Sequence, residues 1–188
     1  MTYPVRLEGA HIILREFRAD DAADSMAIVG DDAVTHWLSF DTRTLNQARD
    51  MLAGAIERAR QIPRTEYYLA VALPSSDRLI GFARLGLDGV KAAKLGFAIR
   101  VDQWGHGYAT DAARTMTDFA FTALGIHRVS AAIGPDNAAS VAVVKRLGFT
   151  YEGTIRDHVF TNGAWRDSQL YSVLEHEWER PTGGRRAD

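Results

Sequence analysis

Apolar positions along the chain follow two different periods, which predict a mixture of helices and strands. The helical period is carried by five residues: Leu45, Ala48, Leu52, Ile56 and Ala59. This spacing predicts an amphipathic helix over about 44–61, ending before Pro63. Shorter runs rich in β-branched and aromatic residues lie at 67–73, 79–85 and 95–101, with turn residues between them. They predict three strands of an antiparallel meander.

Smaller signals predict the remaining elements. A first strand is expected over 12–14, an acid-started helix over 20–29, a long helix after Gly107 and a strand over 128–133. Two local motifs are more specific, and each lies in the second half of the chain.

Asn137 is a favoured helix N-cap, and Gly148 suits the left-handed residue that ends a helix, so a short helix is predicted between them. Asn162-Gly163 lies between two β-rich runs and is the sequence of a tight hairpin turn.

Composition narrows the class of protein. The chain has 188 residues, of which 46% are hydrophobic and 24% charged, which predicts one globular domain over 1–180 with a disordered tail over 181–188. The net charge of −2 gives no basic footprint for nucleic acid. The absence of cysteine excludes disulfides and a cysteine nucleophile, and the six histidines show no metal-ligand spacing. We find no signal-peptide core and no 18-residue apolar run, so we expect a cytoplasmic protein with no membrane partner.

The segment LGFAIRVDQWGHGYATDAA, over 95–113, carries the strongest chemical signal. It joins a strand to a helix through Gly105 and Gly107, whose small size lets several N–H groups point at one place. The N-terminus of a helix favours an anion, which predicts a diphosphate site. The pattern matches neither the ATP/GTP loop nor the dinucleotide fingerprint. An ordinary strand-to-helix turn remains the alternative.

Several segments, in the same order, resemble the GNAT superfamily of acyl-CoA-dependent N-acyltransferases. The resemblance is greatest to its RimJ/RimL-like branch, the ribosomal-protein-alanine N-acetyltransferases. It covers about residues 5–178, and the matching segments are LEGAHIILREFRADDA, LIGFARL, LGFAIRVDQWGHGYATDAA, LGIHRVSAAIGPDNAASVAVVKRLGF and EGTIRDHVFTNGAWRDSQLYSVLEHEW. This resemblance implies the α+β GNAT fold, with a mixed, mostly antiparallel central sheet of six to seven strands flanked by about four helices.

The resemblance also implies acetyl-CoA as co-substrate. Its pantetheine is expected to pair with the end of the strand at Ile99, Arg100 and Val101, and Asn137 is expected to hydrogen-bond the pantetheine or a bridging water. The diphosphate is expected on the turn and first helical residues: Gly105, His106, Gly107, Tyr108, Ala109 and Thr110.

Two departures from the superfamily pattern affect the expected chemistry. Trp104 stands where many members have Arg or Gln, as is usual in this branch, and Val144 stands where many have a tyrosine acid. Ser140 is therefore the expected proton donor to the departing thiolate. Without cysteine we expect direct attack in a ternary complex. Glu66 is the candidate base, although a glutamate that opens a strand is more often solvated.

Other residues have two interpretations each. Trp37 and Phe40 either wall the acceptor cleft or pack in the core. Near the hairpin, three polar residues either line the acceptor site or pair with Arg156 and Arg166: Asp157, His158 and Asp167.

The sequence thus predicts an N-acetyltransferase that acts on a primary amine, which can be a small-molecule metabolite, an antibiotic or a protein N-terminus. A catalytically silent CoA-binding module is the alternative. The acceptor, the acyl chain length, the general base and a homodimer through the terminal strands stay open.

Overall fold

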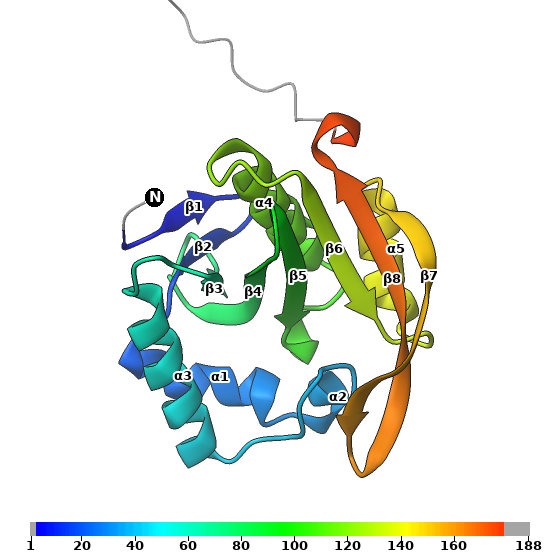
Figure 1. Cartoon of the computed structure of the whole chain (residues 1–188). Coiled ribbons are helices and arrows are strands. Elements are labelled where there is room, and N and C mark those ends of the chain that lie inside the picture. Colours follow the sequence, from blue (N-terminus) through cyan, green and yellow to red (C-terminus); the bar gives the residue numbers. More distant parts are fainter. Residues whose placement is uncertain (1–2, 179–188) are drawn as a thin grey trace, which may run out of the picture.

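The computed structural model describes residues 3–178, which form one eight-stranded sheet with helices on both faces (Figure 1). The strands lie in the order β1-β2-β3-β4-β5-β6-β8-β7. In chain order they are β1 (Arg6–Glu8), β2 (Ile13–Glu16), β3 (Glu66–Ala72), β4 (Leu79–Asp88), β5 (Ala92–Ile99), β6 (Arg128–Ile133), β7 (Thr150–Thr161) and β8 (Ala164–Leu174). The tail predicted over 181–188 lies outside the described residues.

The helices are α1 (Ala22–Val29), α2 (Asp32–Thr35), α3 (Leu45–Ala59), α4 (Tyr108–Thr122) and α5 (Ala138–Arg146), with 3-10 turns η1 (Ala19–Asp21), η2 (Val101–Gln103) and η3 (Glu175–Glu177). The mixed, mostly antiparallel α+β architecture is confirmed. The described residues contain eight strands and five α-helices, which corrects the expected six to seven strands and about four helices. β1 and α2 were missed because three or four residues are too short to show a period.

Local chemistry explains the elements that the sequence predicted. At the start of α3 the N–H of Thr44 donates to Oε1 of Gln47 at 2.8 Å, and the N–H of Gln47 donates back to Oγ1 of Thr44 at 3.3 Å. The hairpin between β7 and β8 turns at Asn162 (φ 52°) and Gly163 (φ 74°), the left-handed pair that a type I′ turn requires.

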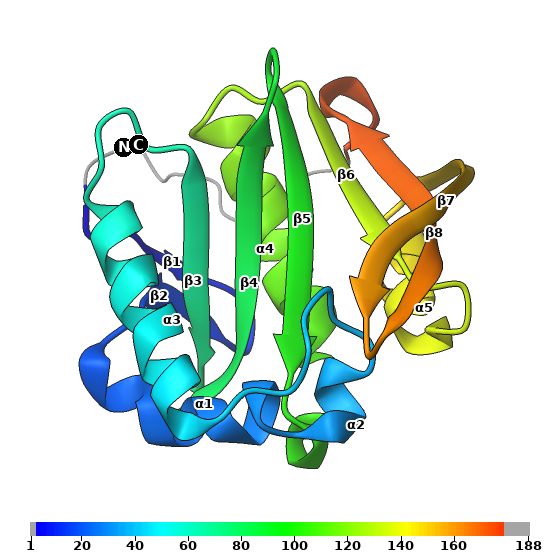
Figure 2. The same cartoon turned by 60° about the horizontal axis from the view of Figure 1, so that its bottom comes forward.

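Strand β3 separates two hydrophobic cores because its side chains alternate between the faces of the sheet. Leu69 and Val71 pack in the core that includes Met116 and Phe119 of α4. On the opposite face, Ala70 packs in the core formed with α1 and α3. Figure 2 shows α1 and α3 in front of β3 and β4, with α4 behind them. Measured against the length and apolarity that a bilayer-spanning helix requires, every helix between residues 3 and 178 falls short.

The C-terminal half of the sheet is tied together by a polar cluster across three strands. Arg128 of β6 donates to Glu152 of β7 at 2.7 Å and to the hydroxyl of Ser172 of β8 at 3.0 Å. The Ser172 hydroxyl in turn donates to Glu152 at 2.7 Å. Hydrogen bonds from Arg128 and Ser172 lower the pKa of Glu152 to about 2.

We expect Glu152→Gln to lower the free energy of unfolding by about 1 kcal/mol at pH 7, a value reduced for the partial exposure of this ion pair. A lowered carboxyl pKa stabilises the folded state above the ordinary value of 4.5, and this stabilisation is lost as pH falls toward 2. Urea denaturation at several pH values should therefore show a difference between wild type and variant that shrinks below pH 4.5. The control is Glu57→Gln, on the exposed face of α3. A pH-independent difference would contradict this account.

Candidate active site

A cavity of about 930 Å³ opens where two parallel strands separate. Within the described residues, β5 and β6 pair only through Ala92–Lys94 and Arg128–Ser130. Beyond these residues the two strands diverge (Figure 2). The cavity is lined by α2 and the loop that follows it, by α3, by strands β3 to β6, by the turn before α4, and by both α4 and α5. Residues far apart in sequence therefore line one cavity.

The open edge of β5 presents unpaired backbone groups to this cavity. In an antiparallel ladder, alternate residues direct their backbone groups toward the partner strand and away from it. The N–H of Arg100 donates to the carbonyl of Ile80 in β4 at 2.9 Å, which fixes the phase of this alternation. Leu95, Phe97 and Ile99 consequently direct their backbone groups toward the gap.

This register corrects the expected end of the strand. The sequence predicted a strand to Val101, but β5 ends at Ile99 and Val101 begins η2. The N–H of Arg100 is already bonded within the sheet, so it is not free for a ligand. The carbonyl of Ile99 accepts a hydrogen bond from the indole N–H of Trp104 at 2.7 Å, which anchors the turn to the strand.

The turn before α4 has the geometry that its glycines predicted. Gly105 and Gly107 have φ values of 80° and 81°, in the left-handed region that favours glycine. A Cβ at either position would meet nothing within 4 Å, so the backbone conformation, and not lack of space, requires glycine. We see no hydrogen bond from the amides of residues 105–110 to another part of the described chain. These amides surround the positive end of the α4 dipole.

Two side chains flank this turn. His106 stacks on Tyr108 with ring centroids 5.5 Å apart, and its Nδ1 lies 2.9 Å from the carbonyl of Trp104. Arg146 of α5 donates to the hydroxyl of Thr110 at 3.2 Å, which places a cation beside the turn. The turn and its surroundings thus combine free N–H donors with positive charge.

The start of α5 lies across the gap. The side-chain oxygen of Asn137 accepts the N–H of Ser140 at 3.0 Å, which confirms Asn137 as the N-cap. Asn137 is buried and Ser140 half-buried, and both line the cavity. Val144 is fully buried in the core with α4, so the position that carries a tyrosine in many GNAT proteins serves packing here.

Glu66, at the start of β3, lines the opposite end of the cavity, where two arginines bind it. Arg58 of α3 donates through Nε to one carboxylate oxygen at 2.9 Å, and Arg84 of β4 donates through Nε to the other. Burial by itself would raise the pKa of Glu66, but the hydrogen bonds from Arg58 and Arg84 outweigh it and lower the pKa below its ordinary value. A carboxylate held in this way is a weak base.

Tyr68 also lines this end of the cavity, and the sequence analysis did not identify it as a site residue. Its ring is buried against Phe17 and Phe82, and its hydroxyl donates to the sulfur of Met51 at 3.9 Å. Burial raises the pKa of Tyr68, and the negative charge of Glu66 adds to the effect. The positive charges that oppose the shift belong to Arg84, Arg43 and Arg58. The Tyr68 hydroxyl therefore stays protonated, with four charged groups around it.

The three arginines were also missed. Arg84 offered a signal, since it is a charged residue within the apolar run of β4, but Arg43 and Arg58 lie on a loop and a helix where arginine is ordinary. Trp37 and Phe40 line the cavity, and Phe40 also packs against the core with α3, so both interpretations hold for it.

The polar residues near the hairpin do not line the cavity. Asp167 accepts the N–H of Asp157 at 2.9 Å, and Nδ1 of His158 lies 2.9 Å from the hydroxyl of Ser168. The ion pairs expected with Arg156 and Arg166 are not among those of the described residues. Arg166 donates instead to the carbonyls of His36 and Leu38 and so holds the segment after α2.

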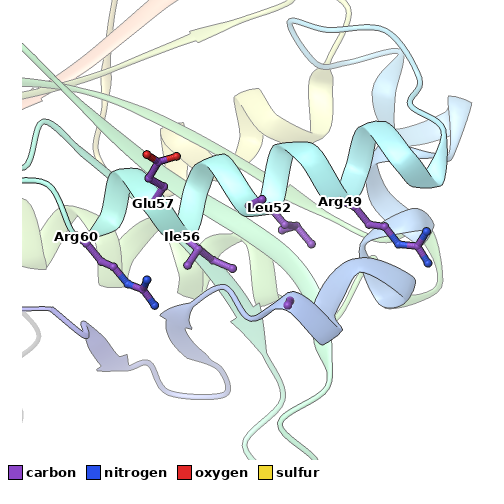
Figure 3. A pocket seen from close by; sticks show the side chains of 7 residues that line it. Arg49, Leu52, Ile56, Glu57 and Arg60 are labelled. Carbon is purple, nitrogen blue, oxygen red and sulfur yellow. The ribbon is translucent and has the colours of Figure 1, made fainter.

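A second hollow, of about 670 Å³, lies between α3 and η1 and shares no lining residue with the cavity. Figure 3 shows Leu52 and Ile56 between Arg49 and Arg60 on this face of α3, with Glu57 directed away from them. No group of three or more potential metal ligands occurs among residues 3–178.

The fold and the cavity define an N-acetyltransferase. The chain belongs to the GNAT acetyltransferase family, because the model described as "Acetyltransferase (GNAT) domain" matches residues 11–150. Enzymes of this family use acetyl-CoA.

Individual relatives agree with this assignment. The chain is 28% identical over 182 residues to "Probable N-acetyltransferase YjcK" of Bacillus subtilis, covering 93% of this chain and 99% of that protein. It is also 28% identical over 115 residues to the ribosomal protein uS5 alanine N-acetyltransferase of Escherichia coli. This match covers 60% of this chain and 59% of that protein. Among solved structures, RimJ of Mycobacterium smegmatis in complex with CoA-disulfide has the same fold. Its TM-score is 0.82 at 24% identity, with 94% of this chain and 91% of that chain covered.

Proposed function

We propose that this protein transfers the acetyl group of acetyl-CoA to a primary amine by direct attack in a ternary complex. One observation carries the proposal: the free amides of the turn before α4 and the unpaired edge of β5 face the same cavity. A diphosphate and an extended amide chain, joined as in coenzyme A, need these two features side by side.

In this proposal the diphosphate binds the amides of residues 105–110, beside the charge of Arg146. The pantetheine extends along β5 as an added strand, bonded to backbone groups of Phe97 and Ile99. The N–H of Ile99 then points at the thioester carbonyl and stabilises the oxygen as it gains negative charge. Asn137 orders the start of α5 on the other side of the gap and hydrogen-bonds the pantetheine or a bridging water.

The reaction forms one C–N bond and breaks one C–S bond. The neutral amine attacks the thioester carbon, and the tetrahedral intermediate expels the thiolate. The nitrogen passes its extra proton to water, and Ser140 hydrogen-bonds the departing sulfur or gives it a proton that water restores to the hydroxyl. An alkylamine with a pKa near 10 is only about 0.1% neutral at pH 7, so a proton must leave first. The role of Glu66 as the base stays a prediction, and its two arginine partners count against it. We assign proton removal to water in the cavity.

Two measurements on one preparation test the proposed function. Calorimetry with acetyl-CoA should give one site per chain, and a thiol-release assay over a panel of primary amines should give turnover with at least one of them. Coenzyme binding without thiol release for any amine would leave the silent CoA-binding module. Absence of binding would overturn the proposal altogether.

Ser140→Ala should lower kcat by about 100-fold, because the thiolate loses its proton donor, and should leave the affinity for acetyl-CoA nearly unchanged. The measurements are steady-state kinetics and calorimetry on the variant and on Ser75→Ala, an exposed serine in the turn after β3 that should behave as wild type. An unchanged kcat in Ser140→Ala would remove this hydroxyl from the mechanism.

A further inference from the structure

The end of the cavity that faces away from α5 has an excess of positive charge. Arg43, Arg58 and Arg84 line it, and Glu66 is the acidic residue among them. Asp136, the other acid that lines the cavity, lies at the start of α5 beside Asn137. One carboxylate therefore lies among three guanidinium groups at this end of the cavity.

Two of these arginines have donors to spare. Arg58 and Arg84 each use Nε for Glu66, and no hydrogen bond of their terminal nitrogens is found within residues 3–178. Their side chains are 46% and 49% exposed, whereas the Glu66 side chain is 14% exposed. Glu66 is thus the more buried partner and orients two guanidinium groups that line the cavity. A guanidinium edge with two parallel N–H groups matches a planar carboxylate.

Arg43 provides a second, independent indication that a hydrogen-bond acceptor from outside the chain binds here. Its guanidinium lies over the ring of Phe40, 4.6 Å from the ring centre. Its Nε is buried and has no hydrogen-bond acceptor among the described residues. A buried donor without an acceptor is destabilising, and such groups in native proteins commonly have a partner outside the chain. The same arginine lines the cavity, so an anion bound there lies within its reach.

We propose that this end of the cavity binds a carboxylate of the acceptor, so that the substrate is an amine carrying a carboxylate, of the amino acid class. The proposal rests on the acetyl transfer proposed above. A polyamine acceptor would bring several positive charges against three arginines, and repulsion between them disfavours it. An acceptor without an anionic group would leave the buried Nε of Arg43 without a hydrogen-bond acceptor.

The test compares amines that differ only in charge. The probes are a series of ω-amino carboxylates of increasing chain length and several α-amino acids, each beside its own carboxamide, with a polyamine added. At the best chain length, kcat/KM for the carboxylate should exceed that for its carboxamide by at least about tenfold, mainly through KM.

Variants then locate the effect. Arg43→Gln and Arg84→Gln should each remove most of the carboxylate preference, measured as the ratio of kcat/KM for each carboxylate to that for its own carboxamide, mainly through a higher KM for the carboxylate. Arg43→Lys keeps the charge and should retain part of the preference. The matched control is Arg49→Gln, at the second hollow on α3 (Figure 3), which should leave kcat/KM for the carboxylate and for its carboxamide unchanged. Circular dichroism and urea denaturation identify a variant that fails to fold, and the Arg43→Lys result then decides.

The outcomes separate this inference from the proposed function. Acetylation of carboxamides or of the polyamine as efficiently as carboxylates would overturn the inference and leave the acetyl transfer intact. If no amine releases thiol, the transfer fails, and calorimetry with CoA-saturated protein still decides the inference. Tighter binding of the amino carboxylate than of its carboxamide supports it, and equal binding overturns it.

Discussion

The early end of the pairing between β5 and β6 is the constraint on which the site depends. Two parallel strands need a crossover between them, and here that crossover is α4. Because the strands share hydrogen bonds only through Ala92–Lys94, the rest of β5 keeps a free edge, and α4 must begin beside that edge. The left-handed residues Gly105 and Gly107 make this start possible. The free strand edge and the open helix N-terminus, on which the proposed coenzyme site rests, then follow from one topological feature.

The opposite end of the cavity concentrates positive charge. Three arginines line it beside a single glutamate, and the buried Nε of Arg43 has no hydrogen-bond acceptor among the described residues. Because side chains alternate along β3, Tyr67 packs in the core with α4 and Tyr68 packs on the other face of the sheet. The positive charges of the three arginines therefore act on the Tyr68 hydroxyl. Glu66 offsets part of the repulsion between Arg58 and Arg84 and fixes their orientation. The cavity thus has N–H donors at the turn before α4 and guanidinium groups near Glu66.

The sequence predicted those parts whose cause is local. The capping of α3 by Thr44 and Gln47, the N-cap Asn137 and the hairpin at Asn162-Gly163 each depend on residues within a few positions of one another. The arginine cluster depends on a loop, a helix and a strand that meet only in the folded chain. Glu66 had the pattern of a free carboxylate, because its partners lie 8 and 18 positions away and no periodicity relates them.

The central claim is that free backbone amides of the turn and of β5 hold the coenzyme, and amide spectra test it most directly. Titration of 15N-labelled protein with coenzyme A should shift the amide signals of residues 105–110 together with those of Phe97 and Ile99. The amide of Arg100, already bonded to Ile80, should shift least along this edge. Saturation that leaves the turn and the β5 edge unshifted, while amides elsewhere move, would contradict the account.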